Sequence, residues 1–266
     1  MRPVLFEIYS VPFFAYRTLL ALAFVVCTLL MVRASRTRPG GIEVSPMLGI
    51  WAMFGSLVGA HGFFIVQYGD VRDVWRAFFV WEGGLVFYGG LFGGLLATAL
   101  YLKFCKVPFL NAADSAGPYL AIGEAIARIG CLLNGCCWGA ICNLPWAMTF
   151  PADSPAFAQQ VADHNLSRTA THSLPVHPTQ IYMVIGLLII SAVLHRALFR
   201  ERPAGLIFFG YVFLYGVLRF LVELVRGDSA RSVLGLTVSG AISAAFVVLG
   251  IAASAYTVRK ARSWSE

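Results

Sequence analysis

Seven long apolar stretches constrain the fold of this chain more than any other feature of its sequence. An α-helix needs about 20 apolar residues to cross the hydrocarbon core of a bilayer. The first stretch is too long for the apolar region of a secretory signal, and no small-residue cleavage site follows it, so we expect it to remain as a membrane anchor. We therefore predict seven membrane spans, near residues 12–32, 47–67, 83–103, 113–133, 178–198, 204–225 and 234–257.

Composition argues against a soluble fold. Of the 266 residues, 59% are hydrophobic and 12% are charged, and the mean hydropathy is +0.76, whereas soluble domains are roughly half apolar and a quarter charged. The net charge of +7 would suggest a nucleic-acid partner in a soluble protein, but in a membrane protein it indicates basic loops that face the cytoplasm and anionic lipid. We expect an all-α, multi-pass protein whose partner is the lipid bilayer and not nucleic acid, with residues 1–266 forming a single transmembrane domain.

Basic residues in the short loops predict the orientation, because Lys and Arg near helix ends are retained on the cytoplasmic side. Four basic clusters all follow odd-numbered spans, which predicts an outside N-terminus and a cytoplasmic C-terminus. The clusters are Arg33, Arg36 and Arg38; Lys103 and Lys106; Arg196, Arg200 and Arg202; and Arg259, Lys260 and Arg262.

One long loop, residues 134–177, joins spans four and five on the outer face. Its Pro, Asp, Ser and Ala content is typical of irregular structure. We expect a small extramembrane head rather than a second core.

The stretch YGVLRFLVELVRGD places three charged residues and a tyrosine at membrane depth. Charges there cost at least about 2.5–3.5 kcal/mol each, so they persist where they pair or line a polar cavity. At about 100° per residue, the four side chains fall on one helical stripe. A self-neutralising ladder is one interpretation, but two guanidinium groups on one carboxylate leave a positive charge suited to a phosphate, which we favour. The residues are Tyr215, Arg219, Glu223 and Arg226.

Span four repeats this chemistry with Glu124 and Arg128, four residues apart, where the two can pair. Arg128 lies near the outer end of its span, so extension to the membrane interface is the alternative to ligand binding. If the two arginine-bearing helices are neighbours, they could clamp one anionic headgroup between them.

The third span contains the glycine-rich stretch WEGGLVFYGGLFGG. Gly89 and Gly93, like Gly90 and Gly94, have the spacing that lets helices approach closely, and we favour this packing role over a phosphate loop. The neighbouring Tyr88 could place its hydroxyl in a shared cavity.

The stretch HPTQIY places polar residues at the expected start of span five. His177 directly precedes Pro178, a natural helix start, so His177, Gln180 and Tyr182 are expected at the outer mouth of this span. A lone histidine is more often structural than catalytic. The same holds for His61 inside span two, although His61 is costlier to bury.

Four of the six cysteines lie within GCLLNGCCWGAIC, residues 130–142. Their spacing is not a familiar zinc pattern, so we expect no metal. An oxidising compartment would permit a disulfide, for instance between Cys137 and Cys142, and a thiol carrier would need a lowered pKa. We favour small, half-buried side chains. The four are Cys131, Cys136, Cys137 and Cys142.

Taken together, these segments resemble the prolipoprotein diacylglyceryl transferase family, bacterial inner-membrane enzymes that begin lipoprotein maturation. The resemblance covers most of the chain and includes seven spans, an outside N-terminus and a periplasmic head. It rests on segments that occur in family order: AYRTLLALAF, GGLVFYGGLFGG, ARIGCLLNGCCWG, LPWAMTFP, HPTQIY and YGVLRFLVELVR.

This resemblance implies transfer of the sn-1,2-diacylglyceryl group from phosphatidylglycerol to a lipobox cysteine thiol in a prolipoprotein signal peptide. Glycerol phosphate would be released, and neither a cofactor nor a metal would be required. Arg128 and Arg219 would bind the headgroup, with Arg226 and Glu223 in support, because fixed positive charge stabilises the phosphate oxygens and favours a thiolate. The substrate-binding candidates are Tyr16, Gly89, Gly90, Gly130, Asn134, Gly135, Gly139 and Tyr215.

Three positions depart from the family pattern. Tyr88 stands where the family has a histidine, and it could take a thiol proton only if its pKa, ordinarily near 10, were strongly lowered. The base is therefore open among Glu223, His177 and a water, with Tyr88 kept as a catalytic candidate. Cys131 and Cys136 replace an asparagine and a glutamate, which removes hydrogen-bonding capacity.

These departures motivate two further hypotheses. A divergent family member could keep the lipid site but use another donor or acceptor. A non-enzymatic lipid-binding or transport protein would form no covalent product, although the sequence shows no inverted repeat that would favour a transporter.

Overall fold

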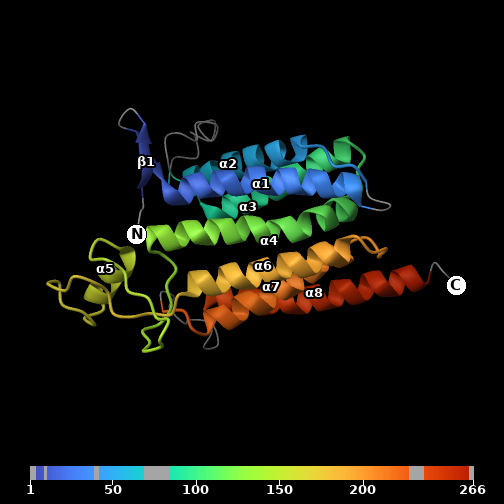
Figure 1. Cartoon of the computed structure of the whole chain (residues 1–266). Helices are drawn as coiled ribbons and strands as arrows, with labels where there is room; N and C mark the ends of the chain where they lie inside the picture. Colours follow the sequence, from blue (N-terminus) through green and yellow to red (C-terminus); the bar gives the residue numbers. More distant parts are fainter. Residues whose placement is uncertain are drawn as a thin grey trace. The chain divides into compact units, whose positions relative to one another are not determined.

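The computed structural model describes residues 4–8, 11–38, 42–68, 84, 86–227 and 237–263, and most of these residues are helical (Figure 1). A short antiparallel hairpin, β1 (Val4–Ile8) and β2 (Val11–Phe14), precedes the helices. The helices are α1 (Ala15–Thr37), α2 (Met47–Tyr68), α3 (Phe87–Phe104), α4 (Phe109–Asn134), α5 (Pro155–Ala162), α6 (Thr179–Leu198), α7 (Leu206–Glu223) and α8 (Val238–Arg262).

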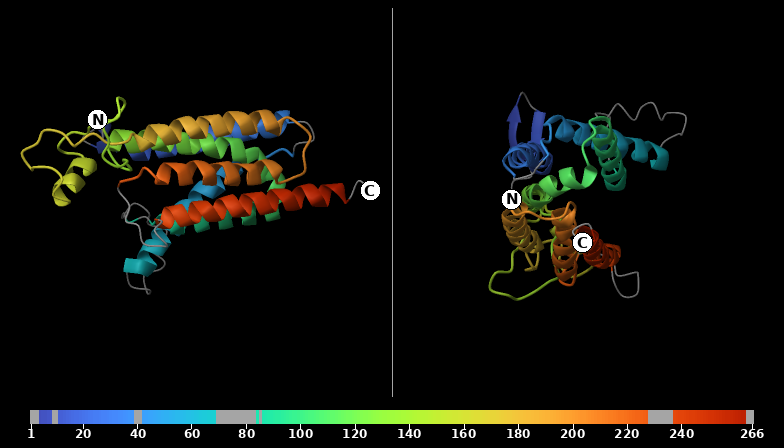
Figure 2. Two further views of the ribbon diagram at one scale, coloured as in Figure 1. Left: turned by 90° about the horizontal axis from the view of Figure 1, so that it is seen from below. Right: turned by 90° about the vertical axis from the view of Figure 1, so that its right-hand side faces the viewer.

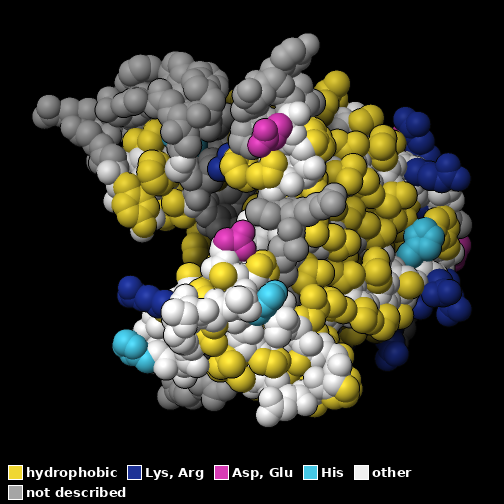
Figure 3. All heavy atoms as spheres, turned by 60° about the vertical axis from the view of Figure 1, so that its left-hand side comes forward, with side chains coloured by type: hydrophobic (Ala, Val, Ile, Leu, Met, Phe, Trp, Pro, Cys, Tyr) yellow, Lys and Arg dark blue, Asp and Glu magenta, His cyan; other side chains and the backbone are white. Residues whose placement is uncertain are grey.

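Six of the described helices, α1, α2, α4, α6, α7 and α8, are long and apolar enough to cross a membrane. Large hydrophobic side chains on these helices are exposed, among them Leu29, Ile189 and Val248, and Figure 3 shows hydrophobic side chains over broad areas of one face. Monomeric soluble proteins rarely expose such extended apolar surface. The structure therefore confirms the prediction of a helical integral membrane protein.

The hairpin is the main departure from the all-α prediction. Residues 12–14, which the sequence placed in the first span, pair with β1 instead, and the rings of Phe6 and Phe13 stack with centroids 4.8 Å apart. Aromatic residues favour strands as well as membrane helices, so apolarity alone did not distinguish them. In addition, α1 extends further than expected, and Arg33 and Arg36 lie in the helix rather than in a loop.

The chain divides into two compact units, residues 1–27 with 116–266, and residues 28–115. In the first unit α7 packs between α6 and α8, as both views in Figure 2 show. The close approach of α7 to α8 depends on Gly216 and Gly250, because a Cβ at either position would collide with the backbone of the other helix.

In the second unit α2 and α3 pack through glycines. A Cβ added at Gly59, Gly89 or Gly93 would collide with the backbone of the opposite helix, which confirms the packing role predicted for the Gly89 and Gly93 pair. His61 of α2 is buried, and its Nδ1 lies 2.9 Å from the carbonyl oxygen of Gly84, which precedes α3.

The predicted head, residues 134–177, contains α5 and otherwise irregular backbone. Met148 and Val176 exchange two backbone hydrogen bonds of 3.0 Å across it. The head has a local apolar cluster that the sequence did not predict. Its buried side chains are Trp138, Phe150, Ala156 and Val176.

Candidate anion-binding site

The carboxy-terminal half of α4 supplies the first ion pair of the site. Arg128 Nη2 lies 2.8 Å from Glu124 Oε1, and the side chains of Arg128 and Glu124 are only 17% and 21% exposed. Tyr215 of α7 donates a hydrogen bond of 3.1 Å to the same carboxylate oxygen. The two arginine-bearing helices are therefore neighbours, as a headgroup clamp requires.

A second ion pair lies on α7. Arg219 Nη2 is 2.8 Å from Glu223 Oε2, and Arg226, just beyond the helix, places its Nη1 3.7 Å from the same oxygen. Thr237, which caps the first turn of α8, donates a hydrogen bond of 2.6 Å to Glu223 Oε1. The buried Glu223 carboxylate is thus contacted from α7, from the residues just after α7 and from the N-cap of α8.

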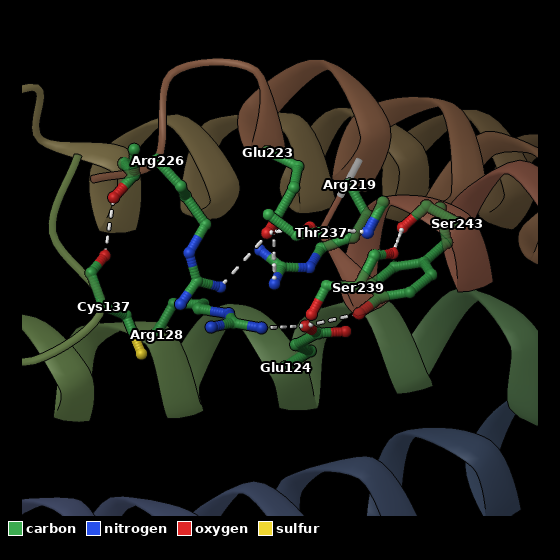
Figure 4. A network of polar contacts seen from close by, with 12 residues as sticks. Glu124, Arg128, Cys137, Arg219, Glu223, Arg226, Thr237, Ser239 and Ser243 are labelled. Atoms are coloured by element: carbon green, nitrogen blue, oxygen red, sulfur yellow. Dashed lines mark hydrogen bonds and ion pairs between the residues drawn. The ribbon is translucent and has the colours of Figure 1, made fainter. Parts of the chain in front are cut away.

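The side chains of Arg128, Arg219 and Arg226 point into one space between α4 and α7 (Figure 4). Within this cluster of described residues, three guanidinium groups face two carboxylates, which leaves a formal surplus of one positive charge. Charge interactions are stronger in such surroundings than in water, so the cluster suits an anion. A small pocket opens between these arginines, and its other lining residues are Cys137, Thr179, Gln180, Met183 and Val222.

Glycines shape the turn that follows α4. Gly135 has a φ of 70°, in the left-handed region that glycine adopts without a steric penalty. Gly139 forms an antiparallel bridge with Arg226, and its backbone amide donates a hydrogen bond of 3.0 Å to the carbonyl oxygen of His177. A Cβ at Gly139 would meet the carbonyl oxygens of His177 and Val225 at 2.8 Å. Gly135 and Gly139, which the sequence predicted to bind substrate, therefore shape the turn that follows α4.

Polar residues in the first turn of α6 hold the same turn in place. Thr179 Oγ1 donates to the Cys137 carbonyl at 2.6 Å, and Gln180 Nε2 donates to the Cys136 carbonyl at 2.7 Å. Gln180 is 1% exposed, and its Oε1 has no hydrogen-bond partner within the described part of the chain. Buried acceptors are rarely left unpaired, so this oxygen is available to a ligand in the pocket.

Three cysteines converge beside the arginines. The Sγ atoms of Cys131, Cys136 and Cys137 all lie within 4.8 Å of one another. The pKa of the Cys137 thiol is below its usual range, mainly because of the neighbouring Cys131 and Cys136 thiols, and the charge of Arg128 acts in the same direction. Cys137 and Cys142 are both free thiols, so the disulfide considered from the sequence is not formed.

Other predicted residues lie at varying positions around this pocket. Tyr16 of α1 packs closely on α4, since a Cβ at Gly130 would lie 3.1 Å from Tyr16 Cα. Asn134 is the last residue of α4 and lies beside the cysteine cluster. His177 is not among the described lining residues, and its Nδ1 lies 3.3 Å from the Tyr182 hydroxyl.

Residues of the third predicted span belong to the second unit. Tyr88 lies in the first turn of α3 and is 47% exposed. Gly89 packs against α2, and Gly90 lies close to the same helix.

Sequence reasoning missed the structural roles of Thr179 and Thr237. Thr237 directly precedes an apolar helix, which is the pattern of an N-cap residue. Thr179 follows the helix-starting proline, but its bond to a residue 42 positions away has no local signature. The sulfur cluster was also missed, because it depends on the turn at Gly135.

Fold and site together define an integral membrane protein with a small arginine-lined pocket among α4, α6 and α7. The chain belongs to the prolipoprotein diacylglyceryl transferase family, which it matches over residues 3–256. It is 29% identical over 254 residues to the phosphatidylglycerol–prolipoprotein diacylglyceryl transferase of Clostridium tetani, covering 94% of this chain and 96% of that protein. The enzyme of the same name from Pasteurella multocida is 32% identical over 236 residues, covering 86% and 80%.

Proposed function

We propose that this protein transfers the diacylglyceryl group of phosphatidylglycerol to a cysteine thiol of a prolipoprotein. The observation that carries the proposal is the convergence of Arg128, Arg219 and Arg226 on one pocket between apolar helices. A phospholipid brings an anionic phosphate diester to such a place together with its acyl chains. Family membership supports the same donor and acceptor.

The arginines act on the leaving group. The acceptor thiol gives up its proton and its sulfur attacks the diacylglycerol carbon that is bonded to the phosphate oxygen. Glycerol phosphate leaves with the electron pair of the broken carbon–oxygen bond. Arg128 and Arg219 stabilise the charge that develops on the phosphate oxygens. Glu223 keeps Arg219 and Arg226 oriented through its contacts of 2.8 and 3.7 Å.

Polar groups beside the arginines select the headgroup. The unpaired Oε1 of Gln180 can accept a hydrogen bond from a hydroxyl of the glycerol headgroup. Tyr16 and Asn134 would shape the space around the lipid. Tyr88 and His177 are retained as candidates that act on the acceptor thiol.

For the topology we propose seven spans, with α3 as the third, in the bacterial inner membrane. The basic residues after the odd-numbered spans support an outside N-terminus and a cytoplasmic C-terminus. The head, residues 134–177, would then be periplasmic and would help to admit the lipobox segment of the signal peptide.

The test uses the purified protein in mixed micelles with phosphatidylglycerol and a lipobox peptide. We expect mass spectrometry to show a peptide that carries one diacylglyceryl group, with release of glycerol phosphate. A peptide with serine in place of the lipobox cysteine is the matched control and should stay unmodified. A product formed only with another phospholipid would favour a divergent family member, and lipid binding without any covalent product would favour a non-enzymatic protein; either result would overturn the proposal.

A further inference from the structure

The three converging thiols at the end of α4 are held by fixed backbone. The amide of Cys136 donates to the Cys131 carbonyl at 3.1 Å, which folds the turn back onto the helix. Bonds from the first turn of α6 fix the carbonyls of Cys136 and Cys137 at 2.7 and 2.6 Å. The backbone that carries the three sulfurs is therefore fixed by hydrogen bonds from α4 and α6.

The spacing of the sulfurs suits a metal ion. A tetrahedral Zn²⁺ with bonds of about 2.3 Å places its sulfur ligands about 3.8 Å apart. The three Sγ atoms already lie within 4.8 Å of one another, so side-chain shifts of about 1 Å complete such a set. Three protein ligands with one open position are the pattern of catalytic rather than structural zinc sites.

The arginine pocket adjoins this set of sulfurs. Cys137 lines the same pocket as the arginines, so a metal on its sulfur would lie beside the phosphate position. No histidine is among the described residues that line this pocket.

We propose that Cys131, Cys136 and Cys137 bind one Zn²⁺ whose fourth position takes the acceptor thiol as a thiolate. This inference rests on the proposed function. The acceptor loses its proton to water as its sulfur binds the metal. That sulfur then forms the bond to the glycerol carbon, the carbon–oxygen bond breaks, and the electron pair leaves on the phosphate oxygen held by Arg128 and Arg219. The thioether product is a weak ligand and departs.

Metal binding is tested independently of activity. The full-length protein is stripped with a chelator and titrated with Zn²⁺, and in parallel with Co²⁺, whose thiolate charge-transfer absorption reports sulfur ligands. We expect one equivalent to bind. Serine at position 131, 136 or 137 should weaken binding by more than the roughly 10–100-fold that loss of an outer-shell partner costs. Cys142→Ser is the matched control and should bind as the wild type does.

Binding that is unchanged in Cys131→Ser, Cys136→Ser and Cys137→Ser would overturn the site, as would absence of a thiolate band in the wild type. Gel filtration and phosphatidylglycerol binding show that each variant is folded. For the catalytic role, metal-free protein should lose transfer and regain it with Zn²⁺. Full transfer by the metal-free protein would overturn that role and leave the proposed function intact, whereas zinc binding without transfer in any form would overturn the proposed function alone.

Discussion

The helix pair α4 and α7 and the helix pair α2 and α3 are held together by opposite means. Between α4 and α7, Tyr215 bonds to Glu124 beside two ion pairs and three arginines. Between α2 and α3, glycines such as Gly59 and Gly93 let the two backbones meet. Helices in a bilayer associate well through close packing alone. Buried charge is therefore not needed to join two helices, and its presence at α4 and α7 supports the proposed ligand site.

The largest effect on stability is expected from Glu223→Gln. Loss of this carboxylate leaves Arg219 and Arg226 without their shared partner, and breaking a buried pair in this way costs about 3–5 kcal/mol. Thermal unfolding in detergent should show a clear fall in Tm. Glu43→Gln is the control, because the ion pair of Glu43 with Arg36 is largely exposed and contributes about 0–1 kcal/mol. Equal shifts in both variants would show that the α4 and α7 charges are no more important than surface charges.

A smaller loss is expected from Gly59→Ala. The added methyl would collide with the backbone of α3, and overpacking of this kind costs about 1–3 kcal/mol. Gly210→Ala is the matched control, because its nearest neighbour would lie at an ordinary 3.5 Å. The same thermal measurement compares the two. An unaffected Gly59→Ala would contradict the glycine-dependent packing of the second unit.

Thr237→Val should have the smallest effect of these substitutions. Valine keeps the shape of threonine but removes the hydroxyl that caps α8 and bonds to Glu223. Loss of such a cap costs about 0.5–2 kcal/mol. Thr237→Ser keeps the hydroxyl and should restore the wild-type Tm; if it behaves like the valine variant, the hydroxyl contacts are not what stabilises this region.

The sequence predicted the contacts within these two helix pairs to different extents. Apolar length located the membrane helices, and helical spacing predicted the Arg219 and Glu223 stripe as well as the pairing of Glu124 with Arg128. The contact between α4 and α7 was only a condition of the predicted headgroup clamp, because tertiary packing decides which helices become neighbours. The glycine contact was easier to predict, since its spacing is itself the packing signal.

The cysteines show why the rest could not be predicted. Their linear spacing matched no metal pattern, yet α4 ends at Asn134 and the left-handed Gly135 turns the chain back, so Cys136 and Cys137 approach Cys131. Hydrogen bonds from Thr179 and Gln180 of α6, more than 40 residues later in the chain, fix that turn. The hairpin was missed for a different reason, because its aromatic residues suit both a strand and a membrane helix.

The most direct test of the central claim is the rate of glycerol phosphate release by Arg219→Ala. If the α4 and α7 arginines stabilise the departing phosphate, kcat/KM should fall about 100- to 1000-fold, while Arg196→Ala, which removes an exposed arginine at the end of α6, keeps the wild-type value. Release by a folded Arg219→Ala variant at the wild-type rate would contradict the account.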